Sequence, residues 1–200
     1  SHMSGIVSLM ADNLAMGSVR LMLSGLAAVM SFLLGAFLTT LCVRWARGRR
    51  MESEYALPLL GEAALLLVFG LTGRVFSGGH VLDTVMLLCF TMGLQNAIIT
   101  KISDAVIRTT HLTGMVTDIG IALGRLMHGG AEDVVANAEL TRLRLLSSLV
   151  VLFFGGGVVG ALGFKHVGFL FTVPLALVLL LLAAMPVLDD VRGVMVRDIY

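Results

Sequence analysis

The sequence contains few charged residues, few prolines, which end helices, and few cysteines, which form disulfide bonds. Of its 200 residues, 14% are Asp, Glu, Lys or Arg, and there are 3 prolines, 2 cysteines and 1 tryptophan. A soluble domain carries about 25% charged residues, and its helices need a polar face. The shortage of charge therefore excludes a soluble protein. The basic residues cluster at the ends of apolar runs, so we also expect no nucleic-acid partner.

Sequence signatures of catalysis and metal binding are also absent. Cys42 and Cys89 lie in apolar runs without a Cys or His at ligand spacing. We therefore expect two small hydrophobic residues rather than a disulfide or a metal pair. The sequence has no nucleophile elbow, no Walker A loop, no G-x-G-x-x-G and no H-E-x-x-H. We expect no enzyme, no cofactor and no metal site.

Long apolar runs dominate what is present. Hydrophobic residues make up 58% of the chain, and the mean hydropathy is +0.97. About 20 helical residues cross the roughly 30 Å hydrocarbon core of a bilayer. Runs of about that length cover residues 20–43, 55–75, 82–100, 145–164 and 168–188. We predict an all-α polytopic membrane helix bundle, with the lipid bilayer as its surroundings.

One stretch, Met92–Met127, interrupts this pattern with polar residues. It begins as an apolar helix with an amide pair, Gln95-Asn96, and breaks at a Gly-containing motif, Thr109-Thr110-His111-Leu112-Thr113-Gly114. Irregular backbone at membrane depth persists only where it is buried in protein or lines a water-filled cavity. We therefore expect a broken helix at this motif, followed by a polar connection over residues 129–144.

The motif has a counterpart at the start of the chain. Ser1–Ser8 matches Thr110–Thr117 at a constant offset of 109, with His, Gly and Val identical and each Ser opposite a Thr. Gly35-Ala36 corresponds to Gly160-Ala161 at an offset of 125. Ser1-His2-Met3 is also a remnant that cloning often leaves, so a chance match is the alternative explanation.

The repeat predicts two pseudo-symmetric halves of about three spans each. We place the first half at residues 1–80, the second at 81–188 and a tail at 189–200. The first half lacks a span equivalent to 82–100, so we expect the natural protein to begin earlier.

The basic residues predict the topology. Arg44–Arg50 is the strongest positive-inside signal. If it is cytoplasmic and the motif segments do not cross completely, only Arg20, Arg74 and Lys165 lie outside. The tail and the C-terminus are then cytoplasmic, and the two halves are inverted, as in many transporters with broken helices.

The signature Met92-Gly93-Leu94-Gln95-Asn96-Ala97, followed by Thr109-Thr110-x-x-Thr113-Gly114, resembles that of the YoaK family. The resemblance covers essentially the whole chain. It implies a multi-pass protein of the bacterial inner membrane, suspected of transport and with no settled substrate. That family also has an earlier Ser/Thr-Gly motif preceded by another helix, which this chain lacks.

The candidate binding residues come from the two motifs. The hydroxyls, amides and backbone there can bind a solute or cation, or instead cap helices and hydrogen-bond across them. The candidates are Gln95, Asn96, Thr109, Thr110, His111, Thr113 and Gly114, with first-half counterparts His2, Ser4 and Gly5.

Two carboxylates are candidates for ion coupling. Glu62 lies inside the span 55–75, where a carboxylate is costly and marks a functional site by default. It can bind a proton, relay protons or pair with a basic group. Asp118 opens the helix after the motif, where it complements the helix dipole or takes part in the site.

The function that these patterns favour is a small secondary transporter or permease for a small solute or ion. A passive oligomeric channel would use the same polar lining without coupling. A non-transporting scaffold or sensor would use the polar motifs only to hold helices together. A homo-oligomer is compatible with all three, and the sequence does not name the solute.

Overall fold

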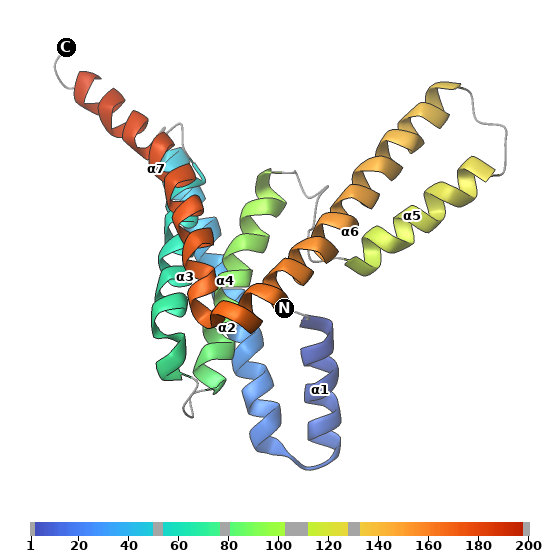
Figure 1. The fold of residues 1–200 in the computed structure, drawn as a ribbon, viewed down its shortest axis with the longest axis horizontal. Helices are drawn as coiled ribbons and strands as arrows, with labels where there is room; N and C mark the ends of the chain where they lie inside the picture. The colour runs from blue at the N-terminus through green and yellow to red at the C-terminus, as the bar shows by residue number, and fades with distance from the viewer. Residues whose placement is uncertain (1–2, 50–53, 77–80, 103–111, 128–132, 198–200) are drawn as a thin grey trace. The chain divides into compact units, whose positions relative to one another are not determined.

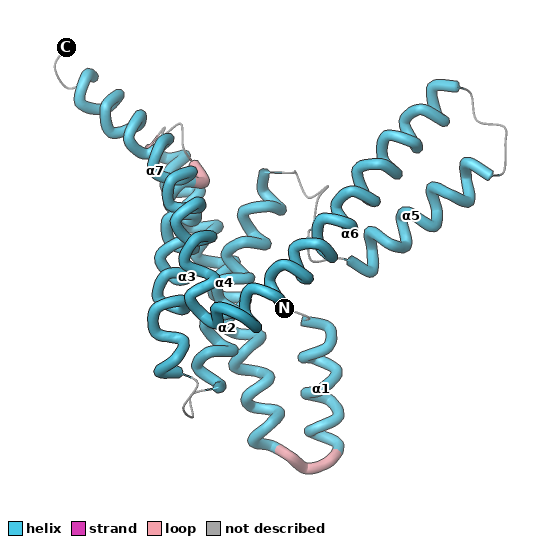
Figure 2. The backbone as a smooth tube through the Cα atoms, viewed as in Figure 1, coloured by secondary structure: helices cyan, strands magenta, loops and turns pink. Residues whose placement is uncertain are grey.

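The computed structural model describes residues 3–49, 54–76, 81–102, 112–127 and 133–197. The described residues contain helices and no strand (Figure 2), which confirms the predicted all-α architecture. The elements are α1 (Met3–Ala15), α2 (Val19–Gly48), α3 (Ala56–Phe76), α4 (Val81–Ile102), α5 (Leu112–Met127), α6 (Asp133–Val167), the 3-10 helix η1 (Gly168–Phe171) and α7 (Thr172–Arg197).

Four helical stretches are long and apolar enough to cross a membrane, and they are Val19–Gly48, Ala56–Gly73, Val81–Ile102 and Glu139–Met185. The first three correspond to the first three predicted spans. The fourth has 47 residues, contains the predicted span 145–164 and covers residues 168–185 of the predicted span 168–188. A straight helix of that length would measure about 70 Å, more than twice the hydrocarbon core. The stretch is interrupted at Gly168, whose φ is 72°. Glycine adopts this backbone conformation readily, whereas it is costly for other residues.

The chain forms two compact units. The larger unit comprises residues 1–107 and 167–200, and the smaller unit comprises residues 108–166. The larger unit holds α1 to α4, η1 and α7, and the smaller unit holds α5 and nearly all of α6. The repeat boundaries at residues 80 and 188 stay predictions.

In the larger unit α2, α4 and α7 run in one direction and α3 runs in the other (Figure 1). The contacts agree with these directions. Along the α2–α4 pair, Ala28 borders the same groove as Val85, and Thr39 contacts Leu94 farther along both helices. The ends of α2, α4 and α7 therefore point the same way.

The α2–α4 crossing depends on two glycines. A Cβ atom at Gly35 would lie 2.2 Å from the carbonyl oxygen of Phe90, and one at Gly93 would lie 2.1 Å from that of Phe32. No larger residue fits at either position without a shift of the backbone. The buried hydroxyl of Thr39 donates a hydrogen bond to the carbonyl oxygen of Leu94 at 3.3 Å. Small residues thus bring the two helices into close contact, as is usual in membranes.

The α3–α7 crossing repeats this arrangement with other residues. A Cβ atom at Gly70 would lie 2.5 Å from Oγ1 of Thr172, and one at Gly73 would lie 2.4 Å from the ring of Phe169. Thr172 donates to the carbonyl oxygens of Leu66, at 3.4 Å, and of Phe169, at 2.9 Å. Residue numbers fall along α3 as they rise along α7, so the two helices are antiparallel.

The helices that contain the motifs are short. α1 has 13 residues and α5 has 16, about 20 Å and 24 Å of helix, so neither reaches across a hydrocarbon core of roughly 30 Å. α1 folds back on α2 through a turn at Gly17, whose φ is 74°. Ile6 and Met10 then lie against Gly25, so α1 covers only the beginning of α2.

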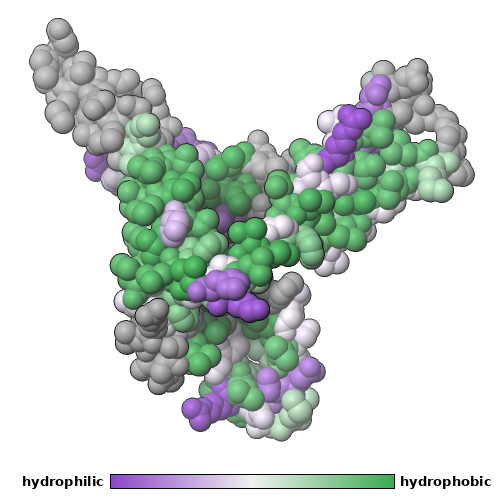
Figure 3. Space-filling view, viewed as in Figure 1, coloured by the Kyte–Doolittle hydropathy of each residue, from purple (hydrophilic) through white to green (hydrophobic). Residues whose placement is uncertain are grey.

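Two polar segments are more helical than the sequence indicated. The connection predicted over 129–144 is helical from Asp133, and the tail predicted from 189 continues α7 to Arg197. The first of these segments is rich in Ala, Leu, Glu and Arg, which favour helix even where the segment is not apolar. Hydrophobic residues cover α3 and the first half of α7 on the face of the larger unit shown in Figure 3.

Candidate functional site

Glu62 is a carboxylate buried within a helix that is apolar enough to span a membrane. Its side chain lies in α3 and is 3% exposed. It shares a helix face with Leu66, Phe69 and Gly73, four, seven and eleven residues farther on, and these residues contact η1 and α7. Among the described residues Glu62 makes no hydrogen bond or ion pair. The helix thus directs an unpaired acid toward the α3–α7 contact.

The amide pair Gln95-Asn96 lies in the second half of α4. Both side chains are half-buried. Asn96 donates a hydrogen bond to the carbonyl oxygen of Met92 at 2.9 Å, within its own helix. No hydrogen bond joins the amide of Gln95 to any other residue that the structure describes.

Glu62 and Gln95 lie at the same depth on neighbouring helices. α3 ends at Phe76, 14 residues after Glu62, and α4 begins at Val81, 14 residues before Gln95. The two helices pack against each other in opposite directions. At 1.5 Å per residue, each side chain is about 21 Å from the shared end of the helix pair. The structure therefore places two of the predicted site positions at the same depth on adjacent helices.

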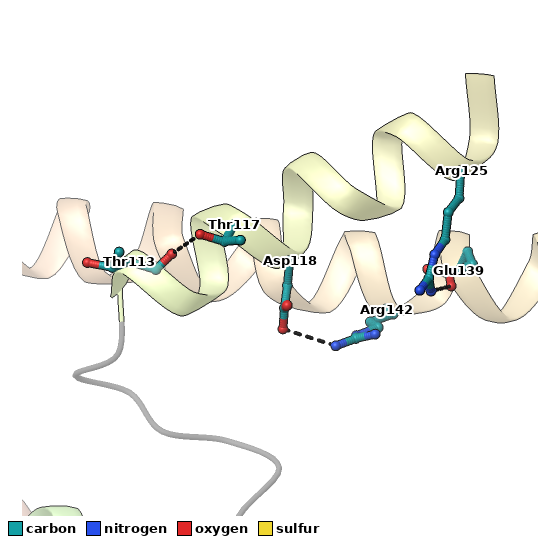
Figure 4. Close-up of polar contacts among 6 residues, drawn as sticks. All are labelled: Thr113, Thr117, Asp118, Arg125, Glu139 and Arg142. Atoms are coloured by element: carbon teal, nitrogen blue, oxygen red, sulfur yellow. Dashed lines mark hydrogen bonds and ion pairs between the residues drawn. The ribbon is translucent and has the colours of Figure 1, made fainter. Parts of the chain in front are cut away.

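The other predicted residues of the second motif lie in the smaller unit. Thr113 and Gly114, in the first turn of α5, are exposed within that unit. Thr117 donates to the carbonyl oxygen of Thr113 at 2.8 Å, a bond within the helix (Figure 4). Thr109, Thr110 and His111 lie outside the described residues.

Asp118 is paired with a basic residue. Nη2 of Arg142 in α6 donates to its carboxylate at 3.0 Å, and Nη1 of Arg125 in α5 donates to Glu139 in α6 at 2.6 Å (Figure 4). The two ion pairs join α5 to the polar beginning of α6. This partner gives Asp118 a structural role, and its role in ion coupling stays a prediction.

The first-half counterparts lie at the beginning of α1. Ser4 and Gly5 are in its first turn and are exposed, and His2 lies outside the described residues. Among the residues that the structure covers, no group of three or more His, Cys, Asp or Glu side chains gathers as a metal site would require.

Sequence reasoning missed the buried hydroxyls that join helices. Thr39 and Thr172 are 0% and 6% exposed, and each hydroxyl reaches a carbonyl oxygen on another helix. A usable signal was present for Thr39, because it follows Gly35 by four residues and therefore lies on the same face of α2.

The glycine-rich part of α6 has no packing partner within the smaller unit. A Cβ atom at Gly155, Gly156, Gly157 or Gly160 would meet nothing within 4 Å. The Gly156–Gly160 spacing favours close packing against another helix, and such packing stays a prediction. The packing glycines that the structure does reveal are Gly35 and Gly93 at the α2–α4 crossing, Gly70 and Gly73 at the α3–α7 crossing, and Gly25 against α1.

Comparison with known proteins gives one match. The sequence profile of a family described as "Protein of unknown function (DUF1275)" matches residues 1–185. This finding confirms the family resemblance carried by the Gln95-Asn96 and Thr-Gly motifs. No curated protein and no solved structure shows significant similarity to the chain.

Proposed function

The chain belongs to the DUF1275 family, and we propose that it is a small secondary transporter of the bacterial inner membrane, with Glu62 as the group that couples solute movement to ion movement. The observation that carries the proposal is the pair Glu62 and Gln95, at one depth on the adjacent helices α3 and α4. Neither side chain has a hydrogen-bond partner among the described residues.

Glu62 and Gln95 are polar side chains within helices that are mostly apolar. A charged or polar side chain inside a bilayer is expensive, and such residues mark substrate and ion pathways or proton relays. A carboxyl group can take up and release a proton without any change of fold. The amide of Gln95, at the same depth on α4, offers both a donor and an acceptor to a solute. Glu62 and Gln95 together therefore provide the minimum chemistry for coupled transport.

The helix directions support an inverted repeat. α3 and α7 close the first and second predicted halves, and they pack antiparallel. Pro58 is the third residue of α3 and Pro174 the third residue of α7, and each is followed by Leu. Proline is tolerated in a first helical turn, so both helices begin alike. Inverted repeats with a central site are a recurrent plan of secondary transporters.

The short motif helices support the same plan. α1 begins at Met3 beside the interior of α2 and is too short to cross the membrane. Its first turn carries Ser4 and Gly5, and the first turn of α5 carries Thr113 and Gly114. Half-helix ends at membrane depth expose backbone N–H groups that can bind solutes. We propose both motifs as further parts of the path.

The common direction of α2, α4 and α7 supports a cytoplasmic C-terminus. Arg44, Arg47 and Arg49 then lie at the same end of the larger unit as Lys101 and Arg197. Arg20 lies at the other end. Trp45 stacks under the guanidinium of Arg49, 5.1 Å from its ring centroid, as suits an interfacial anchor.

The test is transport by protein reconstituted in liposomes that contain a pH-sensitive dye. A panel of small solutes is added outside with and without an imposed proton gradient. We expect at least one solute to move protons with it in a saturable way. Glu62→Gln should abolish this proton movement, because the amide cannot release a proton. Asn96→Ala and Thr113→Ala should abolish solute uptake while expression stays normal.

Gly61→Ala is the matched control for Glu62→Gln. Gly61 is the neighbouring residue on α3, and a Cβ atom there meets nothing within 4 Å. Saturable uptake that is unchanged in the Glu62→Gln protein would refute the coupling role. Flux that is non-saturating and independent of the proton gradient would indicate a channel instead. Absence of flux for every solute, from folded protein, would favour a scaffold.

A further inference from the structure

A groove opens between α1, α2 and the beginning of α4, away from Glu62 and Gln95. Its volume is about 590 Å³. This is within the usual range of roughly 300–1,000 Å³ for small-molecule sites. Most of its lining is apolar, with Ile6 from α1, Ala28 from α2 and Val85 from α4 as examples.

The polar groups of the groove gather toward one end. Asn13, near the end of α1, and Arg20, at the start of α2, flank the turn at Gly17. Ile6 and Ala28 lie farther along the two helices, toward the interior of the larger unit. Hydrophilic residues also gather around the α1–α2 turn in Figure 3. The groove therefore changes from polar to apolar along the direction of the helices.

Arg20 supplies a positive charge without a counter-charge. It makes no ion pair with any residue that the structure describes. The nearest acids on α1 and α4, Asp12 and Asp83, do not line the groove. The amide of Asn13 donates to the carbonyl oxygen of Leu9 at 2.7 Å, which leaves its own oxygen available to accept a hydrogen bond.

We propose that this groove binds one phospholipid with an anionic headgroup. Its phosphate would lie on the guanidinium of Arg20, a planar group that matches phosphate oxygens in a bidentate way. One acyl chain would follow the apolar lining past Ile6, Ala28 and Val85.

The polarity gradient favours a phospholipid over another protein segment. Arg20 begins an apolar helix, so it lies at headgroup depth, and the lining becomes apolar toward the hydrocarbon. A phospholipid matches this gradient, because its anionic headgroup lies at one end and its hydrocarbon chains lie at the other.

The test compares two lipids on the purified full chain. The protein is stripped of lipid in detergent and titrated with phosphatidylglycerol or phosphatidylcholine of identical acyl chains, and native mass spectrometry counts the bound molecules. We expect one tight site that prefers phosphatidylglycerol. Arg20→Gln should weaken phosphatidylglycerol binding about fivefold, the usual effect of one basic residue near a lipid surface. Phosphatidylcholine should bind the variant as it binds the wild type.

Two further variants separate the groove from general surface charge. Val85→Trp fills the apolar part and should remove the tight site for both lipids, while circular dichroism verifies that the protein is folded. Arg49→Gln removes an exposed arginine at the other end of α2 and should leave the site intact. Equal binding of the two lipids, an unchanged Arg20→Gln protein, or a dimer that excludes lipid would each overturn the proposal. None of these measurements depends on transport.

Discussion

Alanine at Gly35 or Gly93 tests the packing of α2 on α4. The added Cβ atoms would lie 2.2 Å and 2.1 Å from carbonyl oxygens of the facing helix, whereas ordinary contacts begin at 3.4 Å. The obstacle in each case is backbone, which no side-chain rotation can remove. The two helices must therefore separate by about 1 Å.

The expected loss of stability follows from two opposing effects. Overpacking of a tight contact costs about 1–3 kcal/mol. Replacement of a helical glycine by alanine returns up to about 1 kcal/mol through helix propensity. We expect a net loss of about 1–2 kcal/mol for Gly35→Ala and for Gly93→Ala. The double variant should cost little more than one single variant, because a single separation of α2 from α4 relieves both clashes.

Thermal unfolding of the purified protein in detergent, followed by circular dichroism, measures the effect. For a chain of this size about 1 kcal/mol corresponds to roughly 2–4 °C in Tm. Gly61→Ala is the matched control, since a Cβ atom there meets nothing within 4 Å. It should leave Tm unchanged or raise it by a few degrees, through propensity alone.

The sign of the change in Tm decides whether α2 and α4 are in close contact at these two glycines. If Gly35→Ala and Gly93→Ala raise Tm as Gly61→Ala does, α2 and α4 do not meet at these residues. Additive losses in the double variant would show that the two glycines relieve separate strains rather than one crossing.

Two further predictions concern polar contacts. Thr172→Val removes the hydroxyl that donates to Leu66 and should lower the free energy of unfolding by about 0.5–1.5 kcal/mol, whereas Thr172→Ser should restore most of it; equal losses would contradict the hydrogen bond. Asp118→Arg should loosen the α5–α6 contact by up to about 1 kcal/mol, because the Asp118 and Arg142 side chains are 40% and 52% exposed. Reversing the pair with Arg142→Asp should recover this loss at low salt, and the same recovery in 1 M salt would argue against an ion pair.

The sequence predicted the helices well because their signal is strong and local. The apolar runs at 20–43, 55–75 and 82–100 became α2, α3 and α4 with ends within a few residues. The helix break at Gly168 was also predicted, as the start of a new span. In each case hydrophobic length alone decides the outcome, and no distant contact is needed.

Helix pairing was not predictable in the same way. Nothing in the residues around Gly35 or Gly70 says which helix lies opposite, since every apolar helix is compatible with lipid and with every other. The equal depth of Glu62 and Gln95 can be inferred only once α3 and α4 are known to be neighbours. The ion pair of Asp118 was not predictable either, because its partner Arg142 lies 24 residues away. Arg142 belongs to a segment that was expected to be a polar connection.

The packing of α7 against α3 has a consequence for synthesis. Leu66 leaves the ribosome 106 residues before its partner Thr172. At about 5–20 residues per second, this interval lasts roughly 5–20 s. During that time α3 is in the bilayer without α7, so the face that carries Glu62, Leu66 and Gly73 lacks its contacts with η1 and α7. The whole α5–α6 hairpin is made in the interval, so the larger unit is completed only when the last helix of the chain arrives.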